Sequence, residues 1–412
     1  MKSETAAALS LLSANAVRTR AHRMLDLALD DALANFRVDL TCLDDIAERV
    51  IAVTRAAYPS LDIPFHSRWR HFVVDGEDRF AAIAAQASWP DAKARARAEF
   101  DLAIVSVLLD AGAGPQWQYI DARSGKKLGR SEGLALASLD MFARGAFFSA
   151  EPADPLRADA SVLAQLTADR LAQGFQVTPD NPLVGLEGRA ALLRSLGQLA
   201  ADSSGVFARN DNARPGGLFD HLAALHDGGT IAAPEILSEL LHEFGPIWPS
   251  RITLGGVPLG DCWRHAALKT DDATDGLVPI HKLSQWLSYS LIEPLQRAGL
   301  FVTDIDGLTG LAEYRNGGLF VDGGVLVLRD SGQAARPHDV GSELVVEWRA
   351  LTIALLDRLA ATIRDKLNMN AETLPLAKVL EGGTWATGRI LARERRSDGA
   401  PPITVISDGT VF

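Results

Sequence analysis

Residues 91–110 read DAKARARAEFDLAIVSVLLD, and the pattern of this stretch decides the fold class. Asp91 follows Pro90 and can cap a helix, and no glycine or proline interrupts the apolar side chains that follow. Gly112 and Gly114 then provide a stop signal. Helical spacing recurs along the chain, at Val17, Ala21, Leu25, Ala28 and Ala32, at Ile46, Val50 and Val53, and at about 131–144, 159–173, 186–201, 234–244, 281–297 and 341–367. The sequence therefore predicts a mainly α protein.

Strand signals are few. Residues 315–329 (RNGGLFVDGGVLVLR) predict a short β-hairpin that turns at Asp322, and residues 65–74 predict a second extended piece. The tail at 401–412 (PPITVISDGTVF) predicts a strand and a turn. Proline, glycine and aspartate cluster at 149–158. We therefore expect an N-terminal helical part at 1–150, with the extended piece, and a second helical part at 151–412, with the hairpin.

The bulk composition excludes several classes of protein. The 412 residues carry a net charge of −11, which argues against a general nucleic-acid-binding surface. Only two cysteines occur, Cys42 and Cys262, and this suits a reducing compartment. The N-terminal apolar run is short and broken by polar residues, and no stretch approaches the length of a membrane helix. We expect a cytoplasmic protein with no nucleic-acid or membrane partner, and the oligomeric state stays open.

Standard catalytic motifs are missing from the sequence. There is no P-loop, no GxGxxG after a strand, no HExxH and no G-x-S-x-G. The segment at 241–244 (LHEF) lacks the second histidine of a zinc helix. We expect neither a cofactor nor a metal.

The segment FHSRWRHF, residues 65–72, is the first candidate site. If it is extended, His66, Arg68 and Arg70 point to one side, because alternate residues of a strand share a face. Such a row of cationic donors suits a phosphate or a carboxylate. The alternative is a surface strand whose arginines pair with acidic residues of this acidic protein.

The second candidate is the helix start VPIHKLSQW at 278–286. A lysine at a helix N-terminus is electrostatically unfavourable, so Lys282 beside His281 suggests a partner or a role. The alternative is a solvated lysine next to a surface histidine.

The third candidate is the glycine-rich stretch at 303–318. It brings together the carboxylates of Asp304, Asp306 and Glu313 and the side chains of Tyr314 and Arg315. Glycines allow backbone to approach a ligand, and Glu313 could be a carboxylate tuned by its neighbours. The alternative is a structural Glu–Arg pair before the hairpin.

These three segments resemble one known family. The resemblance is to the uracil-catabolism proteins that form the fourth component of the URC pathway. It is carried by FHSRWRHF (65–72), VPIHKLSQW (278–286) and GLAEYRNGGLF (310–320). The resemblance covers nearly the whole chain. It implies a cytoplasmic protein that acts after uracil has become a nucleotide and its ring has opened, on a ribosylurea species from which urea is released.

A more distant resemblance concerns residues 181–365. LEGRAALL (186–193), KLSQ (282–285), DI (304–305), AEYR (312–315) and EWR (347–349) are similar in order and spacing to the queuosine-nucleotide glycosidase family. This implies a helical fold like that of the helix-hairpin-helix DNA glycosylases, and hydrolysis of an N-glycosidic bond to ribose 5′-phosphate. The family's catalytic aspartate falls on Glu313, which is one methylene longer. Its lysine falls on Lys282, with His281 as the alternative.

Both resemblances lead to one hypothesis, an N-glycoside hydrolase that needs no cofactor. Hydrolysis through an oxocarbenium-like transition state needs a carboxylate, a donor for the leaving nitrogen and a grip on the remote phosphate. We expect Glu313 to activate water, and Lys282, with His281, to act beside the leaving group. The expected substrate contacts are His66, Arg68 and Arg70, with Arg315, on phosphate, Asp304 or Asp306 on ribose hydroxyls, and Tyr314.

Two other classes of function stay open. One is a metal-dependent amidohydrolase or deaminase that acts on the ureido group. The other is a non-catalytic binding protein of the same pathway. The expected partner is a small-molecule substrate, a ribosylated ureido compound, and whether it is phosphorylated stays open.

Overall fold

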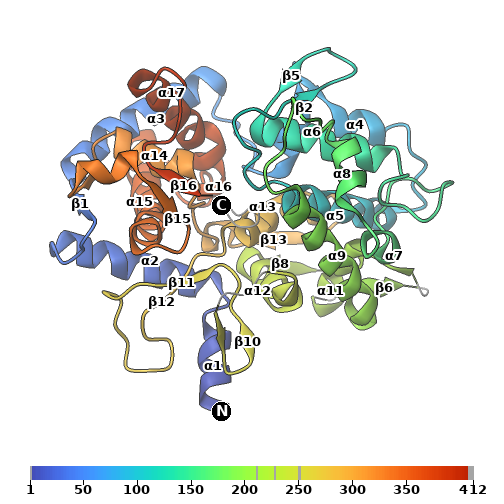
Figure 1. Ribbon diagram of the computed structural model, residues 1–412, viewed down its shortest axis with the longest axis horizontal. Coiled ribbons are helices and arrows are strands. Elements are labelled where there is room, and N and C mark those ends of the chain that lie inside the picture. Colours follow the sequence, from blue (N-terminus) through green and yellow to red (C-terminus); the bar gives the residue numbers. More distant parts are fainter. Residues whose placement is uncertain (1, 210–211, 227–228, 249–251, 407–412) are drawn as a thin grey trace. The chain divides into compact units, whose positions relative to one another are not determined.

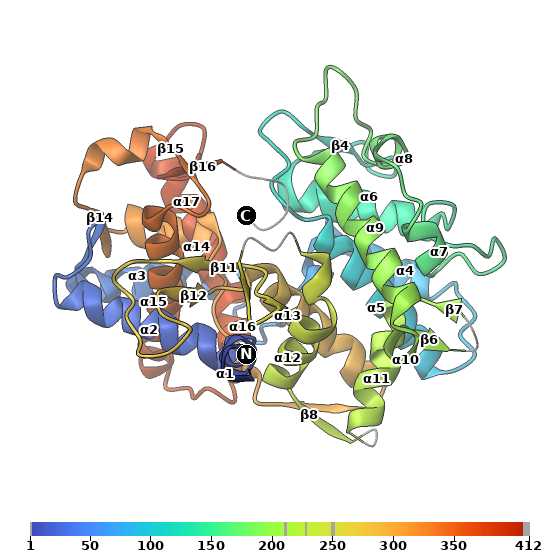
Figure 2. The same cartoon turned by 60° about the horizontal axis from the view of Figure 1, so that its bottom comes forward.

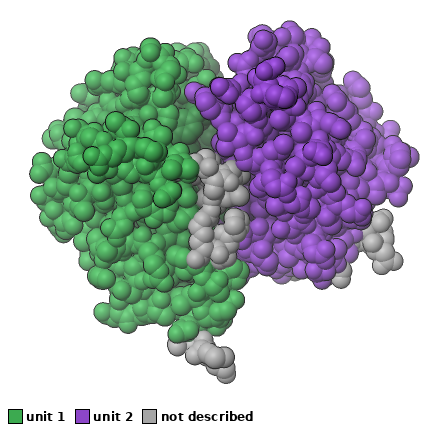
Figure 3. All heavy atoms as spheres, in the orientation of Figure 1, with its two compact units in different colours: residues 1–66, 250–285, 304–406 green, residues 67–249, 286–303, 407–412 purple. Residues whose placement is uncertain are grey.

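The computed structural model describes residues 2–209, 212–226, 229–248 and 252–406. The chain divides into two compact units, which Figure 3 shows in different colours. Unit 1 comprises Met1–His66, Ser250–Gln285 and Asp304–Ile406, and unit 2 comprises Ser67–Pro249, Trp286–Thr303 and Ser407–Phe412. The expected boundary at residue 150 falls inside unit 2, and the C-terminal residues 407–412 of the expected tail lie outside the described residues.

The helices of unit 1 are α1 (Lys2–Ser10), α2 (Ala14–Leu29), α3 (Leu43–Ala57), α14 (Tyr314–Asp322), α15 (Glu343–Leu367), α16 (Leu376–Val379) and α17 (Trp385–Arg395). The short helices η1 (Leu40–Cys42), η5 (Ile305–Gly307), η6 (Ser331–Ala335) and the π-helical turn η7 (Leu380–Thr384) join them. Its strands are antiparallel pairs, β1 (Phe36–Val38) with β14 (Leu326–Leu328), β9 (Thr253–Leu254) with β10 (Val257–Pro258) and β11 (Cys262–Arg264) with β12 (Leu277–Pro279), and one parallel pair, β15 (Pro337–Asp339) with β16 (Thr404–Ile406).

The helices of unit 2 are α4 (Arg79–Ala84), α5 (Ala92–Leu108), α6 (Arg130–Ala143), α7 (Ala160–Leu163), α8 (Ala168–Gly174), α9 (Leu186–Asp202), α10 (Ser204–Phe207), α11 (Leu218–Leu225) and α12 (Ala233–Glu243), with η2 (Arg68–Phe72), η3 (Pro215–Gly217) and η4 (Gly245–Ile247). Its strands pair as β2 (Val73–Val74) with β3 (Glu77–Asp78), β4 (Tyr119–Ile120) with β5 (Lys127–Leu128), β6 (Ala208–Arg209) with β7 (Asn212–Ala213), and β8 (Thr230–Ala232), in parallel, with β13 (Phe301–Thr303). Helix α13 (Lys282–Arg297) begins in unit 1 and ends in unit 2.

Unit 1 is built around the long helix α15. Ser342 caps this helix, and buried side chains lie on every side of its first half, from Leu344 to Leu356. Helix α2 packs along it through a buried stripe that includes Val17, Ala21 and Leu25, as the spacing predicts. Figures 1 and 2 show α2, α3 and α14 gathered around α15, and α17 lies against α14 and α3.

Unit 2 contains the stretch from which the fold was inferred. Asp91 caps α5, because its carboxylate accepts a hydrogen bond from the Ala94 backbone N–H at 2.6 Å. The side chains from Glu99 to Leu108 are all buried, so this half of α5 forms the core against α6 and α11. The prediction of a mainly α fold with small strand pairs is confirmed. None of the described helices has the length and apolar character that crossing a membrane requires.

The hairpin expected at 315–329 is wrong. Glu313 caps a helix instead, and α14 continues to Asp322 before a turn leads into β14, which pairs with β1. Gly317 and Gly318 make this possible, because a Cβ at Gly317 would lie 2.7 Å from the indole of Trp348 on α15. The glycines therefore serve close helix packing rather than a β-turn.

The extended piece expected at 65–74 is also wrong over most of its length. Residues 68–72 form the 3-10 helix η2, and only Val73 and Val74 belong to a strand. The side chains of Trp69 and Phe72 are both buried in this conformation, three positions apart. A 3-10 helix, with three residues per turn, places both of these apolar side chains on one buried face. A strand, with its period of two, would place them on opposite faces.

Candidate functional site

The cationic row expected at residues 66–70 does not form. Arg68 is fully buried in unit 2, where its Nε donates to the Ser106 hydroxyl at 2.6 Å and its Nη1 lies 3.1 Å from Asp110. Burial lowers the pKa of the Arg68 guanidinium, and the charge of Asp110 opposes this shift. Arg68 is thus an internal cross-link between η2 and α5.

The other two members of the row are also engaged with acids. Arg70 donates to Glu293 at 2.8 Å within unit 2. His66 belongs to unit 1, where its Nδ1 lies 2.7 Å from the Glu381 carboxylate. The pairing of arginines with acids, which the sequence left as an alternative, therefore describes this segment better than an open anion-binding face.

The start of α13 is held by one buried carboxylate, that of Asp261. It accepts a hydrogen bond from the Lys282 backbone N–H at 2.9 Å and from the Trp263 indole at 2.6 Å, and Arg349 binds both of its oxygens. Arg349 is the main cause that lowers the pKa of Asp261 to about 2, against the effect of burial. An ionised carboxylate at a helix N-terminus also complements the helix dipole.

His281 lies directly before α13 and is buried. Its backbone is left-handed, with φ of 49°, and its Nε2 lies 3.2 Å from the Leu11 carbonyl. Burial lowers the pKa of His281, and Asp261 opposes this shift. A neutral imidazole that donates to a carbonyl is the result, so His281 ties α13 to the end of α1.

The loop before α14 is linked to α13 by a reciprocal pair of hydrogen bonds. The Gln285 side-chain amide donates to the Thr309 hydroxyl at 2.8 Å, and its carbonyl accepts from the Thr309 backbone N–H at 3.3 Å. The helix that carries Lys282 is therefore connected, within unit 1, to the segment that leads to Glu313.

The two aspartates of this loop differ in their surroundings. Asp306 accepts hydrogen bonds from Arg364 and from the Leu376 backbone N–H, both at 2.6 Å. Asp304 is exposed and has a left-handed backbone, with φ of 47°. Asp306 is therefore engaged in holding η5 to α15 and α16, and Asp304 is the more accessible carboxylate.

Glu313 is the N-cap of α14. Its two carboxylate oxygens accept hydrogen bonds from the backbone N–H groups of Arg315 at 3.0 Å and Asn316 at 2.6 Å. The side chain is half-buried. A carboxylate offers about four acceptor positions, so two backbone donors leave capacity for water or a ligand hydroxyl.

Arg315 is the most unusual side chain of the region. It is 5 % exposed, and its guanidinium carbon lies 4.1 Å from the centre of the Trp385 ring and 4.9 Å from that of Tyr314. Its Nε and Nη2 are buried and meet no hydrogen-bond partner among the described residues. Aromatic rings attract the cation but do not replace the hydrogen bonds that these N–H groups lose on burial.

Other buried polar atoms without partners lie on the helices around Arg315. Among the residues that the structure describes, they include Asn316 Oδ1 of α14, Trp348 Nε1 of α15, Thr384 Oγ1 of η7 and Thr387 Oγ1 of α17. Helix α14 packs on both α15 and α17, and a Cβ at Gly388 would collide with the Arg315 carbonyl oxygen. Each unsatisfied buried group costs about 1–3 kcal/mol, so such a concentration is typical of a ligand site rather than of a core.

Sequence reasoning named Arg315 but missed the groups around it. Trp385, Thr384 and Thr387 come about 70 positions later, and no local spacing connects them to Glu313. Asp261 was also missed. The signal that could have found it was Arg349 of the EWR segment, since a buried arginine in a long apolar helix requires an acidic partner.

The first residue of the EWR segment, Glu347, is also fully buried. Its carboxylate accepts hydrogen bonds from the backbone N–H groups of Asn35 at 3.2 Å and Phe36 at 2.7 Å, and from the Asn35 side chain at 2.9 Å. Glu347 therefore holds the start of β1 to α15.

Unit 2 has a surface pocket of about 420 Å³ between α5 and the end of α13. Arg95 and Arg297 line it, and both pair with the buried carboxylate of Glu99. None of the site residues expected from the sequence lines this pocket. The pocket has no unpaired charge to offer an anion, and the Arg315 region remains the better candidate.

Comparison with known proteins gives full-length matches. A family model described as "Protein of unknown function (DUF1688)" matches residues 10–412. Protein urg3 of Schizosaccharomyces pombe is 39% identical over 422 residues, with 100% of both chains covered. Uracil catabolism protein 4 of Lachancea kluyveri is 37% identical over 434 residues, with 97% of this chain and 98% of that protein covered. These matches confirm the first resemblance inferred from the sequence, and the glycosidase resemblance stays a prediction.

Proposed function

This chain belongs to the DUF1688 family, and from that membership we propose that it acts in uracil catabolism, as a hydrolase that cleaves the N-glycosidic bond of a ribosylurea compound. The observation that supports a role in uracil catabolism is the match to a protein named Uracil catabolism protein 4, which covers nearly the whole of both chains. The surroundings of Glu313 and Arg315 support the choice of reaction.

Arg315 is the proposed anchor for the anionic end of the substrate. Its two unpartnered buried nitrogens can donate to phosphate oxygens, and charge-assisted hydrogen bonds of this kind are the strong ones. The Thr387 hydroxyl, on the neighbouring helix α17, and the Thr384 hydroxyl, at the end of the preceding turn η7, provide further donors. Arg315 replaces His66, Arg68 and Arg70 in this role, since those three are already paired with acids.

Glu313 is the proposed general base. Water attacks the anomeric carbon, and its proton passes to the Glu313 carboxylate. The electron pair of the C–N bond moves to the urea nitrogen, which takes a proton from Lys282. The products are ribose, or its phosphate, and urea, and solvent returns the proton from Glu313 to Lys282. A carboxylate beside the anomeric carbon also stabilises the positive charge of an oxocarbenium-like transition state.

The proposed donor, Lys282, lies in the first turn of α13, and the proposed base caps α14. The Gln285–Thr309 hydrogen bonds hold the two segments in one unit. Asp304, the exposed carboxylate of the connecting loop, is the proposed contact for ribose hydroxyls. No cofactor takes part in this scheme.

The test is urea release from ribosylurea and from its 5′-phosphate by purified protein. Glu313→Gln keeps one oxygen to cap α14, and we expect it to lower the rate at least 100-fold with little loss of stability. The matched control is Asp39→Asn, which changes another capping carboxylate of unit 1, one that accepts from the Thr41 backbone N–H at 2.9 Å. Wild-type release by Glu313→Gln, or equal losses in both variants, would rule out Glu313 as the base.

A further inference from the structure

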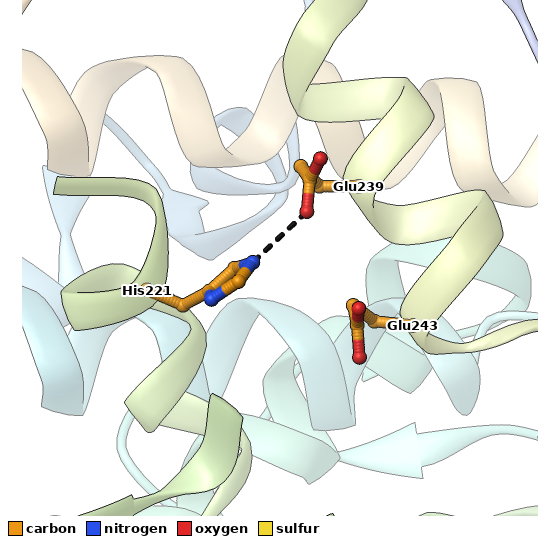
Figure 4. Close-up of side chains that lie close together, drawn as sticks. All are labelled: His221, Glu239 and Glu243. Carbon is orange, nitrogen blue, oxygen red and sulfur yellow. Dashed lines mark hydrogen bonds and ion pairs between the residues drawn. The ribbon is translucent and has the colours of Figure 1, made fainter. Parts of the chain in front are cut away.

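A second cluster of side chains lies in unit 2 and shares no residue with the proposed glycosidase site. His221 projects from α11, and Glu239 and Glu243 project from α12 (Figure 4). One imidazole nitrogen of His221 and one carboxylate oxygen from each glutamate all lie within 4.8 Å of one another. One of these contacts is a hydrogen bond of 2.9 Å, between His221 and Glu239.

We propose that His221, Glu239 and Glu243 bind a divalent transition-metal ion of the zinc class. One imidazole nitrogen and two carboxylate oxygens form a ligand set that zinc accepts, at metal–ligand distances of about 2.0–2.2 Å. Oxygen-only ligands would favour magnesium or calcium instead. Three protein ligands leave at least one coordination position for water or a small ligand.

The two helices that carry the three side chains are fixed by their buried apolar faces. Glu239 and Glu243 are four residues apart and therefore share one face of α12. Leu237, Leu240 and Leu241 of the same helix are buried, as are Leu218, Phe219 and Leu222 of α11. The ligand atoms need move only about 1 Å to reach the separations of a zinc sphere, and rotation of half-exposed side chains allows this.

The charge balance of the cluster favours a cation. Two glutamates at i and i+4 repel each other. Among the residues that the structure describes, no lysine or arginine forms an ion pair with either of them, and His221 is the partner of Glu239. A divalent ion would compensate both carboxylates and take the place of the His221–Glu239 hydrogen bond, with the imidazole proton on Nδ1.

The neighbouring histidine provides the matched control. His242 is exposed on the same helix, and its Nδ1 donates to the Ser238 carbonyl at 2.8 Å, outside the cluster. Changing His242 removes one surface histidine, as changing His221 does, without removing a proposed ligand. Glutamine at position 221 can still donate to Glu239, so His221→Gln is expected to fold.

The experiment is calorimetric titration of the EDTA-treated, dialysed full-length protein with zinc chloride, in the absence of substrate. We expect one equivalent to bind to wild type and to His242→Gln with equal affinity, and at least tenfold more weakly to His221→Gln and to Glu243→Gln. Zinc should raise the melting temperature of the first two proteins only. No one-equivalent binding by wild type, or unchanged affinity in His221→Gln and Glu243→Gln, would overturn the proposal. The titration measures no urea release, so its outcome is independent of the proposed glycosidase.

Discussion

Arg349 and Asp261 form a bidentate ion pair across 88 positions of the chain, with both Nη–Oδ distances at 2.8 Å. The Arg349 side chain is 1% exposed and that of Asp261 is 8% exposed. Because Asp261 also caps α13, this pair connects the long helix α15 to the segment that carries His281 and Lys282. The position of the proposed proton donor therefore depends on a charge pair that does not itself take part in the reaction.

Removal of the arginine should destabilise the protein strongly. Arg349→Met leaves a buried carboxylate without its partner, and we expect the free energy of unfolding to fall by about 3–5 kcal/mol. Urea denaturation measures this change. The control is Arg49→Met, which breaks a half-exposed pair with Glu394 and should cost less than about 1 kcal/mol. Equal effects of the two substitutions would contradict the role given to the Arg349–Asp261 pair.

Because of the Arg349–Asp261 pair, we expect the stability of the protein to fall at acidic pH. Since the pKa of Asp261 is lowered to about 2 in the folded protein, its contribution is fully present above about pH 4 and disappears as the pH falls toward 2. The contribution is roughly 2 kcal/mol. Asp261→Asn should be less stable at neutral pH and should lack this part of the pH dependence. Unfolding curves of both proteins between about pH 5 and pH 2 measure the difference. If the two curves run parallel, Asp261 is not the group that titrates.

Phosphate should stabilise the protein through Arg315. Inorganic phosphate that binds the folded state raises the melting temperature in a concentration-dependent manner. In Arg315→Met we expect at least a tenfold higher phosphate concentration for the same rise. Arg49→Met, which removes an arginine from an exposed pair of the same unit, should respond as wild type does. If Arg315→Met responds to phosphate as wild type does, Arg315 is not the residue that binds the anion.

Helices α17 and α14 lie so close together at Gly388 that a methyl group added there should destabilise the protein. A Cβ at Gly388 would collide with the Arg315 carbonyl oxygen, so Gly388→Ala should lower the free energy of unfolding by about 1–3 kcal/mol. It should also weaken the phosphate response, since Arg315 would shift. At Gly205, which is helical and has no atom within 4 Å of such a Cβ, the same substitution should not destabilise. Thermal unfolding of the two variants distinguishes packing from helix propensity.

The helices could be predicted from the sequence because their signals are local. Asp91 and the apolar run behind it placed α5 to within one or two residues, and the spacing of Val17, Ala21 and Leu25 identified the buried face of α2. The segment at 315–329 was misinterpreted, because Gly-Gly pairs at a close helix contact look like turn signals. Local sequence does not say what lies opposite a glycine.

The candidate site was predicted only in part, for a related reason. Glu313 and Arg315 are close in sequence, and their proximity could be inferred. The Trp385 ring that covers Arg315, the Glu381 carboxylate that engages His66 and the Asp261 carboxylate that holds Lys282 are all distant along the chain. Such pairings arise from the tertiary fold, which a single sequence does not display.

Unit 1 cannot complete its core during translation until the C-terminal quarter of the chain has been made. The Asn35 side chain donates to Glu347, 312 positions later, and the apolar stripe of α2 lacks its main packing partner until α15 has been made. Domains generally fold as units when synthesis delivers all of their parts. Nascent chains and C-terminally truncated products therefore expose α2 and α3 as amphipathic helices without a core. Chaperones and proteases would act on these two helices first. A stop codon ahead of α15 would prevent the whole of unit 1 from folding.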